Sequence, residues 1–228
     1  MIRAIGFDLD NTLFDHRRAA SRGLGLLIDE KGWTYHGTES VARQWHRLED
    51  LFFGQYVAGT MTLVDHRRAR MRNFLALTNA QIDESELDDL WSNYLHHYSD
   101  SWVAYPDVLV SLTELKETGY KMAVLTNGQQ AQQEAKLHAM GLTHLFEAVL
   151  AIGTVDALKP NQSAFQHLCR VLECEPREVL FVGDDIEYDV RASISAGLQG
   201  LWLNRDSLAT PDGINDQIQS LSSIRAFL

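Results

Sequence analysis

Short apolar runs alternate with helical patterns from about residue 103 to the end of the chain. The runs that we interpret as strands are KMAVLT (121–126), AVLAI (148–152), VLFV (179–182) and LWL (201–203). The segments with helical spacing between them are 108–118, 129–140, 164–172 and 187–196. Glycines occupy the positions where helix C-caps belong, at Gly119, Gly141 and Gly197. This alternation predicts an α/β fold with a doubly wound parallel sheet and a Rossmann-like core.

The beginning of the chain has a different pattern. The apolar run 2–7 predicts one more short strand. After it, the sequence has almost no strand pattern and is rich in helix formers and aromatic residues. Four amphipathic helices are predicted there, at 19–31, 40–57, 63–77 and 84–99. We therefore expect an α/β core built from residues 1–14 and 103–228, with a helical-bundle domain inserted at 15–102.

Two carboxylates and a hydroxyl follow the first predicted strand, at Asp8, Asp10 and Thr12. In an open α/β sheet, ligands bind at the carboxyl ends of the strands. Carboxylates two residues apart repel each other and lose hydration when they are enclosed, so stability alone does not explain this pair. A bound cation or a proton-sharing reaction would explain it. The structural alternative is an Asx turn followed by a helix N-cap.

Polar motifs also follow the second and third strands of the predicted core. Thr126, Asn127 and Gly128 place a hydroxyl and backbone N–H groups where a helix should begin, which is a site for an anion. Lys159 follows the third strand, and Pro160 suits the first turn of the next helix. We expect the ammonium group of Lys159 to reach the same edge of the sheet. Helix capping and a solvated lysine are the alternatives.

A last acidic motif, with Asp184, Asp185 and Asp189, follows the fourth strand of the core. A Gly-Asp-Asp sequence is by itself a common turn. Four polar motifs that each follow a different strand would, however, meet at one edge of a parallel sheet. The combination predicts a single catalytic site there.

Together these motifs resemble those of the haloacid dehalogenase superfamily in its phosphatase form. The matching residues are Asp8-Leu9-Asp10-Asn11-Thr12, Thr126-Asn127-Gly128, Lys159-Pro160, and Gly183-Asp184-Asp185 with Asp189. The resemblance implies that the insertion is a helical cap and that Mg²⁺ is the cofactor. It also implies that the side chains of Asp8 and Asp184 and the backbone carbonyl of Asp10 bind the metal. Asp185 stands where relatives more often carry a small polar residue, so its contact with the metal stays open.

The chemistry expected of these residues is the hydrolysis of a phosphate monoester. Asp8 would attack phosphorus and form an aspartyl-phosphate, and Asp10 would protonate the leaving alkoxide and later deprotonate water. Asp10 must then hold a proton near neutral pH, which enclosure and acidic neighbours favour. Thr126 and Lys159 would stabilise the equatorial oxygens, with Asn127 and Gly128 also binding the phosphate. We expect Asp189 to orient Lys159 or a metal-bound water.

The substrate predicted in this way is a small phosphorylated metabolite, a nucleoside monophosphate or a sugar phosphate. The segment 196–205 weakly resembles a branch that contains bacterial nucleoside 5′-monophosphate phosphatases. One alternative is a 2-haloacid dehalogenase of the same fold, which needs neither the metal nor a second acid. Another is a phospho-accepting domain like the receivers of bacterial two-component systems. Asp10 and the acidic motif that contains Asp184 favour the phosphatase.

Composition excludes several partners. The formal charge of −11 leaves no basic surplus to neutralise a nucleic-acid polymer. The chain has no apolar stretch long enough for a membrane span, and the acidic motif begins too near Met1 for a signal peptide to precede it. Cys169 and Cys174 fit neither a zinc site nor a disulfide, so we expect core packing and a cytoplasmic location. The sequence does not indicate an oligomeric state.

The insertion contains three further clusters, for which a structural role is the better interpretation. Its arginines, Arg67, Arg68, Arg70 and Arg72, do not share one helix face, so we expect a solvated helix surface. The adjacent His96 and His97 diverge on a helix and are not expected to bind a metal. The aromatic residues should form the insertion's own core; they are Trp33, Trp45, Phe52, Phe53, Trp91 and Tyr94.

Overall fold

The computed structural model describes residues 1–155 and 157–228. The chain forms two compact units. The first, which we call the core unit, contains Met1–Asp15 and Val103–Leu228, and the second, the helical unit, contains His16–Trp102. Each unit has a hydrophobic interior of its own.

The core unit is built on a six-stranded parallel sheet with the order β3-β2-β1-β4-β5-β6. The strands are β1 (Ala4–Phe7), β2 (Lys121–Gln129), β3 (Ala148–Ile152), β4 (Val179–Gly183), β5 (Gln199–Leu203) and β6 (Gln217–Ile218). The chain builds one half of the sheet outward from β1 to β3 and then returns to build the other half from β4 to β6. The predicted doubly wound α/β fold is confirmed, and the direction of winding reverses between β1 and β4, where such folds bind ligands.

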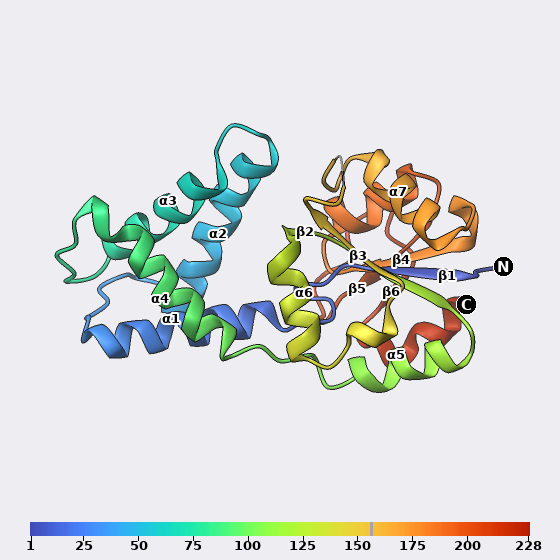
Figure 1. Cartoon of the computed structure of the whole chain (residues 1–228), viewed down its shortest axis with the longest axis horizontal. Coiled ribbons are helices and arrows are strands. Elements are labelled where there is room, and N and C mark those ends of the chain that lie inside the picture. The colour runs from blue at the N-terminus through green and yellow to red at the C-terminus, as the bar shows by residue number, and fades with distance from the viewer. Residues whose placement is uncertain (156) are drawn as a thin grey trace. The chain divides into compact units, whose positions relative to one another are not determined.

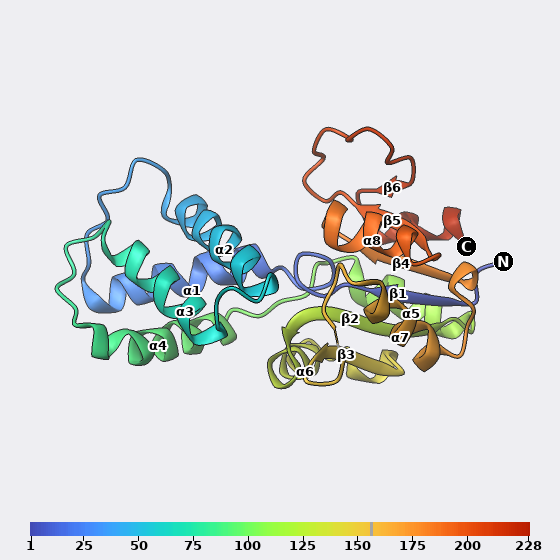
Figure 2. The ribbon, with the colours of Figure 1, turned by 90° about the horizontal axis from the view of Figure 1, so that it is seen from above.

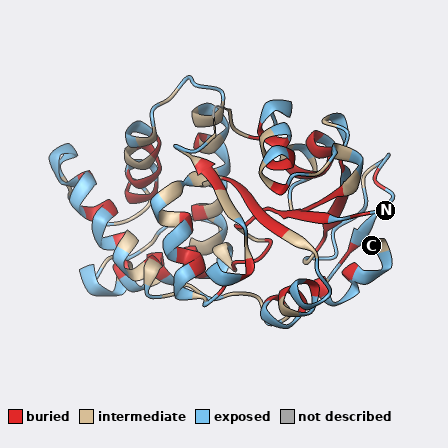
Figure 3. Cartoon of the chain, turned by 45° about the vertical axis from the view of Figure 1, so that its right-hand side comes forward, coloured by how far each residue is buried: buried red, intermediate tan, exposed pale blue. Residues whose placement is uncertain are grey.

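Helices cover both faces of this sheet, which explains why every residue of the central strands β1 and β4 is buried. The helices are α5 (Val108–Glu117), α6 (Gln130–Ala139), α7 (Gln162–Leu172) and α8 (Ala192–Ser195), with a π-helix at Ile186–Arg191 and a C-terminal 3₁₀ helix at Leu221–Phe227. Helix α7 lies on one face and α5 on the other (Figure 1), and the strands between them are buried (Figure 3). A Cβ at Gly6 would lie 2.5 Å from Leu168, so only glycine lets α7 pack this closely on β1.

Four details of the core differ from the sequence-based expectations. Strand β2 continues through Thr126-Asn127-Gly128 to Gln129 with an irregular register against β3, so the motif lies in the strand end and not at a helix N-terminus. Pro160 follows a cis peptide bond and precedes the N-cap Asn161, and therefore lies outside the first turn of α7. The expected helix at 187–196 is a π-helix followed by the short α8. Strand β6, of only two residues, was not predicted.

The helix ends marked by glycine were predicted correctly. Gly119, Gly141 and Gly197 all have the positive φ of a C-terminal cap, at 90°, 71° and 90°. The loop between β5 and β6 extends away from the sheet (Figure 2). Among the described residues, no helix combines the length and the apolar character needed to cross a membrane.

The helical unit consists of α1 (His16–Lys31), α2 (Val41–Val57), α3 (Leu63–Leu75) and α4 (Leu87–Ser99), with a 3₁₀ turn at Glu84–Glu86 before α4. Its interior is aromatic, as predicted. The ring of the buried Trp45 lies 5.0 Å from that of Tyr94 and 5.5 Å from that of Phe74. Phe52 and Trp91 are also buried, whereas Trp33 and Phe53 are partly exposed.

The prediction of a solvated arginine surface is confirmed for two residues and wrong for a third. Arg68 and Arg72 form exposed ion pairs with Asp88 and Glu84. Arg70, in contrast, is only 2% exposed. A buried guanidinium must be paired, and the partner is a glutamate of another helix that the spacing of the arginines does not reveal.

The partner of Arg70 is Glu49, at the centre of a buried polar cluster. The Arg70 guanidinium donates to both carboxylate oxygens, at 2.9 and 3.1 Å, and stacks on Trp45 with 3.9 Å between Cζ and the ring centroid. His16 lies 3.0 Å and His46 lies 3.7 Å from the same carboxylate. His96 and His97 lie beside carboxylates of Asp100 and Glu30.

Candidate active site

The residue that organises the site is a buried lysine between two carboxylates. Lys159, 3% exposed, places its ammonium nitrogen 2.7 Å from Oδ1 of Asp8 and 2.6 Å from Oδ1 of Asp189. Asp8 directly follows β1 and Asp189 lies in the π-helix that follows β4, so the neighbouring strands bring both acids to one point. The geometry matches the expected reach of Lys159 to this edge and its contact with Asp189.

A third carboxylate completes the cluster. Ligand atoms of Asp8, Asp184 and Asp189 all lie within 4.8 Å of one another. Three carboxylates around one ammonium group leave an excess of two negative charges when all the acids are ionised. A divalent cation with a preference for hard oxygen ligands would neutralise that excess, and Mg²⁺ has this preference. The cluster therefore fits Mg²⁺ by charge and by donor type.

The pKa values of the cluster reflect the same excess. Burial raises the pKa of Asp184 well above 3.8, and repulsion from Asp8 adds to the effect. Burial also raises the pKa of Asp189 to about 7, against the opposing influence of Lys159. Burial alone would lower the pKa of Lys159, but the two carboxylates beside it outweigh burial and the net shift is upward. The ammonium group is therefore held in its charged form.

Hydrogen bonds fix the loop after β1 against the loop after β4. The buried hydroxyl of Thr12 accepts a bond from the Asp184 amide at 3.1 Å and lies 3.5 Å from the Asp184 carboxylate. Arg205 donates to the backbone oxygen of Thr12 at 2.9 Å from Nη2. Asn11 adopts a left-handed conformation, φ 62°, which Asn tolerates better than most residues. Thr12 therefore positions Asp184 through contacts, and its expected supporting role has a geometric basis.

Asp185 and Asp189 are linked through the backbone. Oδ1 of Asp185 accepts bonds from the amides of Glu187 and Tyr188, both at 2.8 Å, and so caps the π-helix. The amide of Asp185 donates to Oδ2 of Asp189 at 3.1 Å. A Cβ at Gly183 would lie 2.2 Å from that same oxygen, so glycine is needed there. This geometry makes Asp185 a structural residue of the loop.

Asn127 holds Lys159 in place. Its side-chain amide donates to the backbone oxygen of Lys159 at 2.7 Å and accepts from the backbone amide of Lys159 at 2.9 Å. The amide of Asn127 thus pairs with one peptide unit in the way that a neighbouring strand would. Because the side-chain amide is engaged in this way, the contact of Asn127 with a phosphate that the sequence predicts would have to come from its backbone N–H.

Two site residues were missed in the sequence, and both lie on α6. Lys136 places its ammonium nitrogen 2.5 Å from Oδ1 of Asp10, and Gln133 donates to Oδ2 of Asp10 at 2.9 Å. Both side chains are buried. The sequence contained one indication of their burial. Gln133 and Lys136 stand three positions apart, on the helix face that also carries the buried Leu137.

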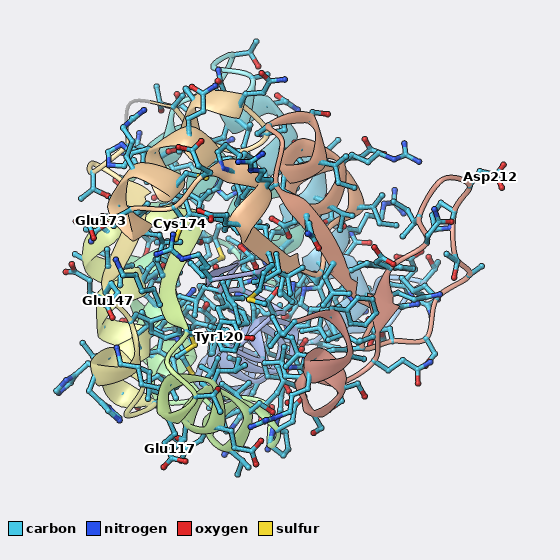
Figure 4. The ribbon with its side chains drawn as sticks, turned by 90° about the vertical axis from the view of Figure 1, so that its right-hand side faces the viewer. Glu117, Tyr120, Glu147, Glu173, Cys174 and Asp212 are labelled. Atoms are coloured by element: carbon cyan, nitrogen blue, oxygen red, sulfur yellow. The ribbon has the colours of Figure 1, made fainter. Side chains whose placement is uncertain are left out.

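A hollow of ≈ 560 Å³ lies at the opposite end of the strands, where Arg3 precedes β1 and Cys174 precedes β4. Figure 4 views the core unit from this end, with Glu173 and Cys174 labelled. Two of the acids that line it are paired, Glu178 with Arg3 and Glu173 with Lys121. Among the described residues, the acidic cluster that fits a metal lies at the other end of the sheet.

Known proteins resemble this chain over most of its length. N-Acylneuraminate-9-phosphatase from Mus musculus is 30% identical over 214 residues, which cover 90% of this chain and 83% of that protein. Glyceraldehyde 3-phosphate phosphatase from Methanopyrus kandleri is 32% identical over 224 residues, which cover 95% of this chain and 90% of that protein.

The fold has close counterparts among solved structures. The HAD-hydrolase YfnB from Bacillus subtilis, solved bound to magnesium, aligns with a TM-score of 0.84 at 20% identity and covers 99% of this chain and 98% of that one. At this level of identity the likeness supports the fold alone. The sequence model of the haloacid dehalogenase-like hydrolases matches residues 2–197. The chain therefore belongs to the haloacid dehalogenase-like hydrolase family.

Proposed function

We propose that this protein is a Mg²⁺-dependent phosphatase that hydrolyses phosphate monoesters of small metabolites through an aspartyl-phosphate. The observation that carries the proposal is the buried ammonium of Lys159 between Asp8 and Asp189, with Asp184 as a third carboxylate. The relatives named as phosphatases support the reaction class.

Asp8 is the proposed nucleophile. One of its carboxylate oxygens attacks phosphorus, the bond from phosphorus to the ester oxygen breaks, and the alcohol leaves. A phosphate dianion repels a carboxylate, so its charge must be neutralised before Asp8 can approach. Lys159 supplies one positive charge beside Asp8 at 2.7 Å. The hydroxyl of Thr126 and the backbone N–H group of Asn127 are proposed as further donors to the phosphate oxygens. The amide of Gly128, expected as another donor, is engaged with Oγ1 of Thr126 at 3.3 Å.

The carboxylates of Asp8 and Asp184, with the backbone carbonyl of Asp10, are the proposed metal ligands. When bound, Mg²⁺ would neutralise phosphate charge and act as a Lewis acid toward a phosphate oxygen. Asp189 accepts from Lys159 at 2.6 Å and is assigned the role of orienting it. Asp185 supports the loop through its backbone contacts.

Asp10 is the proposed acid and base. It gives a proton to the leaving oxygen in the first half of the reaction and takes one from water in the second, which releases phosphate and restores Asp8. Both of its oxygens accept bonds from α6, one of them from the ammonium of Lys136. These contacts favour the ionised form that acts as the base and disfavour the protonated form that the first half of the reaction requires, in contrast to the acidic neighbours expected from the sequence. The carboxylate lies on the loop after β1, two residues from the nucleophile, where a leaving group would depart.

The competing functions fit the molecule less well. A receiver has the strand order 2-1-3-4-5, whereas this sheet has six strands in a different order, so the receiver alternative is wrong. A dehalogenase would need neither Asp10 nor the third carboxylate. In this protein Asp10 accepts a bond from the buried Lys136, and the backbone amide of Asp184 donates to the hydroxyl of Thr12.

The substrate is proposed to be a sugar phosphate or a related small phosphorylated metabolite, in line with the substrates in the relatives' names. A nucleoside monophosphate stays in the test set because the segment 196–205 resembles a branch with that activity. We propose that the helical unit acts as the cap that contributes to substrate choice. The two cysteines are free, which is consistent with the proposed cytoplasmic location.

The experiment is a screen of phosphate release with and without Mg²⁺. Its substrates are N-acylneuraminate 9-phosphate, glyceraldehyde 3-phosphate, hexose phosphates and nucleoside monophosphates, with 2-chloropropionate included for halide release. Phosphate release that depends on Mg²⁺ and disappears in Asp8→Asn supports the proposal. Halide release without metal, or no turnover of any phosphate ester, would overturn it.

A further inference from the structure

We propose that Gln133 and Lys136 on α6 are positioning residues, which hold the carboxylate of Asp10 and align it with the hydroxyl of Thr126. The inference rests on the proposed phosphatase function, in which Asp10 is the acid and base. Neither α6 residue would touch the substrate. Each would act through the group that it holds.

The amide nitrogen of Gln133 joins two functional groups. It donates to Oδ2 of Asp10 at 2.9 Å and to Oγ1 of Thr126 at 2.8 Å, so both of its protons are used. Gln133 is fully buried, and its Oε1 has no hydrogen-bond partner among the described residues. Because Oε1 is left without a partner, the orientation of the Gln133 side chain is set by Asp10 and Thr126, which accept its two amide protons.

This contact also determines what the Thr126 hydroxyl can do. Its oxygen accepts from Gln133 and from the amide of Gly128 at 3.3 Å. With its lone pairs engaged in this way, the hydroxyl is left to donate its own proton, which is the role that a phosphate oxygen requires. A Cβ at Gly128 would lie 2.1 Å from the Gln133 amide nitrogen, so the glycine of the motif makes room for this arrangement.

Lys136 holds the other oxygen of Asp10. Its side chain is 2% exposed, its nitrogen lies 2.5 Å from Oδ1 of Asp10, and it lies 4.7 Å from the ring centroid of Phe14. Asp10 and Phe14 both belong to the loop after β1. A buried ammonium is stable only when it is paired, so Lys136 ties α6 to this loop. The two α6 side chains together leave the Asp10 carboxylate little freedom to rotate.

The test compares two esters. Lys136→Met keeps an unbranched side chain, one atom shorter, and removes the charge that holds Asp10. We expect it to lower kcat for an alkyl ester, glycerol 3-phosphate, by about 10–100-fold with little change in KM, because an acid displaced by about 1 Å loses this much. The burst of nitrophenolate from p-nitrophenyl phosphate should fall by less than about threefold, since that leaving group needs no proton.

Gln133→Met should give a different pattern, because Gln133 also orients Thr126. Both esters should be slowed, with the alkyl ester affected more. Gln132→Met, one position away on α6, and Lys116→Met, on the surface, are the matched controls and should retain the wild-type rates. Each variant is used only if it unfolds cooperatively and its midpoint still rises with Mg²⁺.

A double-mutant cycle with Asp10→Asn separates positioning from a general structural effect. If Lys136 acts through Asp10, then Lys136→Met should cause no further loss of the alkyl-ester rate in the Asp10→Asn background. Equal losses on both esters, or losses that multiply in the double variant, would overturn the inference. If Lys136→Met does not fold, the cycle of Gln133→Met with Asp10→Asn is used instead. If Gln133→Met then lowers the alkyl-ester rate by the same factor with and without Asp10→Asn, Gln133 does not act through Asp10 and the inference is overturned.

The two levels of proposal fail separately. If the wild-type protein releases no phosphate from any ester, the proposed function is wrong. If the wild-type protein is active and Asp10→Asn is impaired, but both α6 variants match their controls, only the positioning role is wrong.

Discussion

The two units each contain a cluster of buried and partly buried charged side chains, and the two clusters differ in charge balance. In the core unit the carboxylates of Asp8 and Asp189 flank the ammonium of Lys159, and the carboxylate of Asp184 lies close to both acids. In the helical unit the single carboxylate of Glu49 is surrounded by donors from Arg70, His16 and His46. The first cluster lacks positive charge, whereas the second is complete.

The pKa values of the acids differ accordingly. Burial by itself would raise the pKa of Glu49, but Arg70 and His16 outweigh it and lower the pKa well below 4.5. Burial and repulsion between carboxylates raise the pKa of Asp184 instead. A buried cluster that satisfies its own charges is a structural element. A cluster that does not satisfy them needs a ligand, so the comparison predicts opposite responses to a divalent cation and to substitution.

The largest expected effect is that of Asp8→Asn on activity. The amide keeps the shape of the side chain but can neither attack phosphorus nor bind the cation as an anion. We expect the loss in kcat to be at least about 1,000-fold, because the loss of a nucleophile is rarely compensated. Steady-state phosphate release measures it, with Glu84→Gln on the surface as the control. A near-wild-type rate would show that Asp8 is not the nucleophile.

The second effect is the response to Mg²⁺. A saturating cation at about 100 times its Kd should stabilise the folded protein by about 2.7 kcal/mol, which corresponds to a rise in Tm of about 5–10 °C. The rise should be lost in Asp184→Asn and kept in Glu49→Gln, because only the core cluster lacks positive charge. Thermal scans with EDTA and with Mg²⁺ measure this. Full activity in excess EDTA would contradict the proposed metal dependence.

The third prediction concerns the stability of the helical unit. Glu49→Leu leaves the buried guanidinium of Arg70 unpaired and should lower the free energy of unfolding by about 3–5 kcal/mol. Replacing both partners, as Glu49→Leu with Arg70→Met, should restore most of the loss. Urea titrations compare these variants with Glu84→Gln, which breaks an exposed pair and should leave the free energy of unfolding nearly unchanged. Saturating Mg²⁺ should leave the difference between Glu49→Leu and the wild-type protein unchanged.

The smallest expected effect is a pH dependence from His66. This residue is 6% exposed, its ring nitrogens have no hydrogen-bond partner among the described residues, and burial together with Arg70 lowers its pKa to about 4. The folded state then binds fewer protons than the unfolded state, whose pKa is 6.5. The stability present above pH 6.5 is therefore lost as the pH falls toward 4.

The His66 contribution is measured by urea unfolding at several pH values. Between pH 7.5 and pH 5 the wild-type protein should lose about 2 kcal/mol through this residue. His66→Phe removes the titrating group at similar volume and should flatten this part of the profile. The pKa of Asp189, raised to about 7, lies in the same window, so the His66 contribution is taken from the difference between the wild-type protein and His66→Phe. An unchanged slope in His66→Phe would show that another group carries the pH dependence.

The sequence alone was sufficient for the fold class, and it indicated which polar residues meet at one edge of the sheet. Alternating strand and helix patterns are local, and each polar motif stands at the end of a strand. Because parallel strands end at one edge, Asp8, Lys159 and Asp184 could be expected to meet. The helix ends at Gly119 and Gly141 could likewise be predicted from a local signal, the glycine itself. Where the sequence failed locally, as at Thr126 and Pro160, an irregular strand and a cis peptide bond replaced the regular patterns.

Only the tertiary structure decided which charges pair. Lys136 is 126 positions from Asp10, and Arg70 is 21 positions and one helix away from Glu49. Periodicity indicates that a helix face is buried, but it does not indicate which carboxylate a buried cation on that face will meet. That depends on how the helices pack, and packing is determined by the shape of many side chains at once. The sequence therefore determined which polar groups meet at the edge of the sheet, while the packing of α6 and of the helical unit determined which partners hold the buried charges in place.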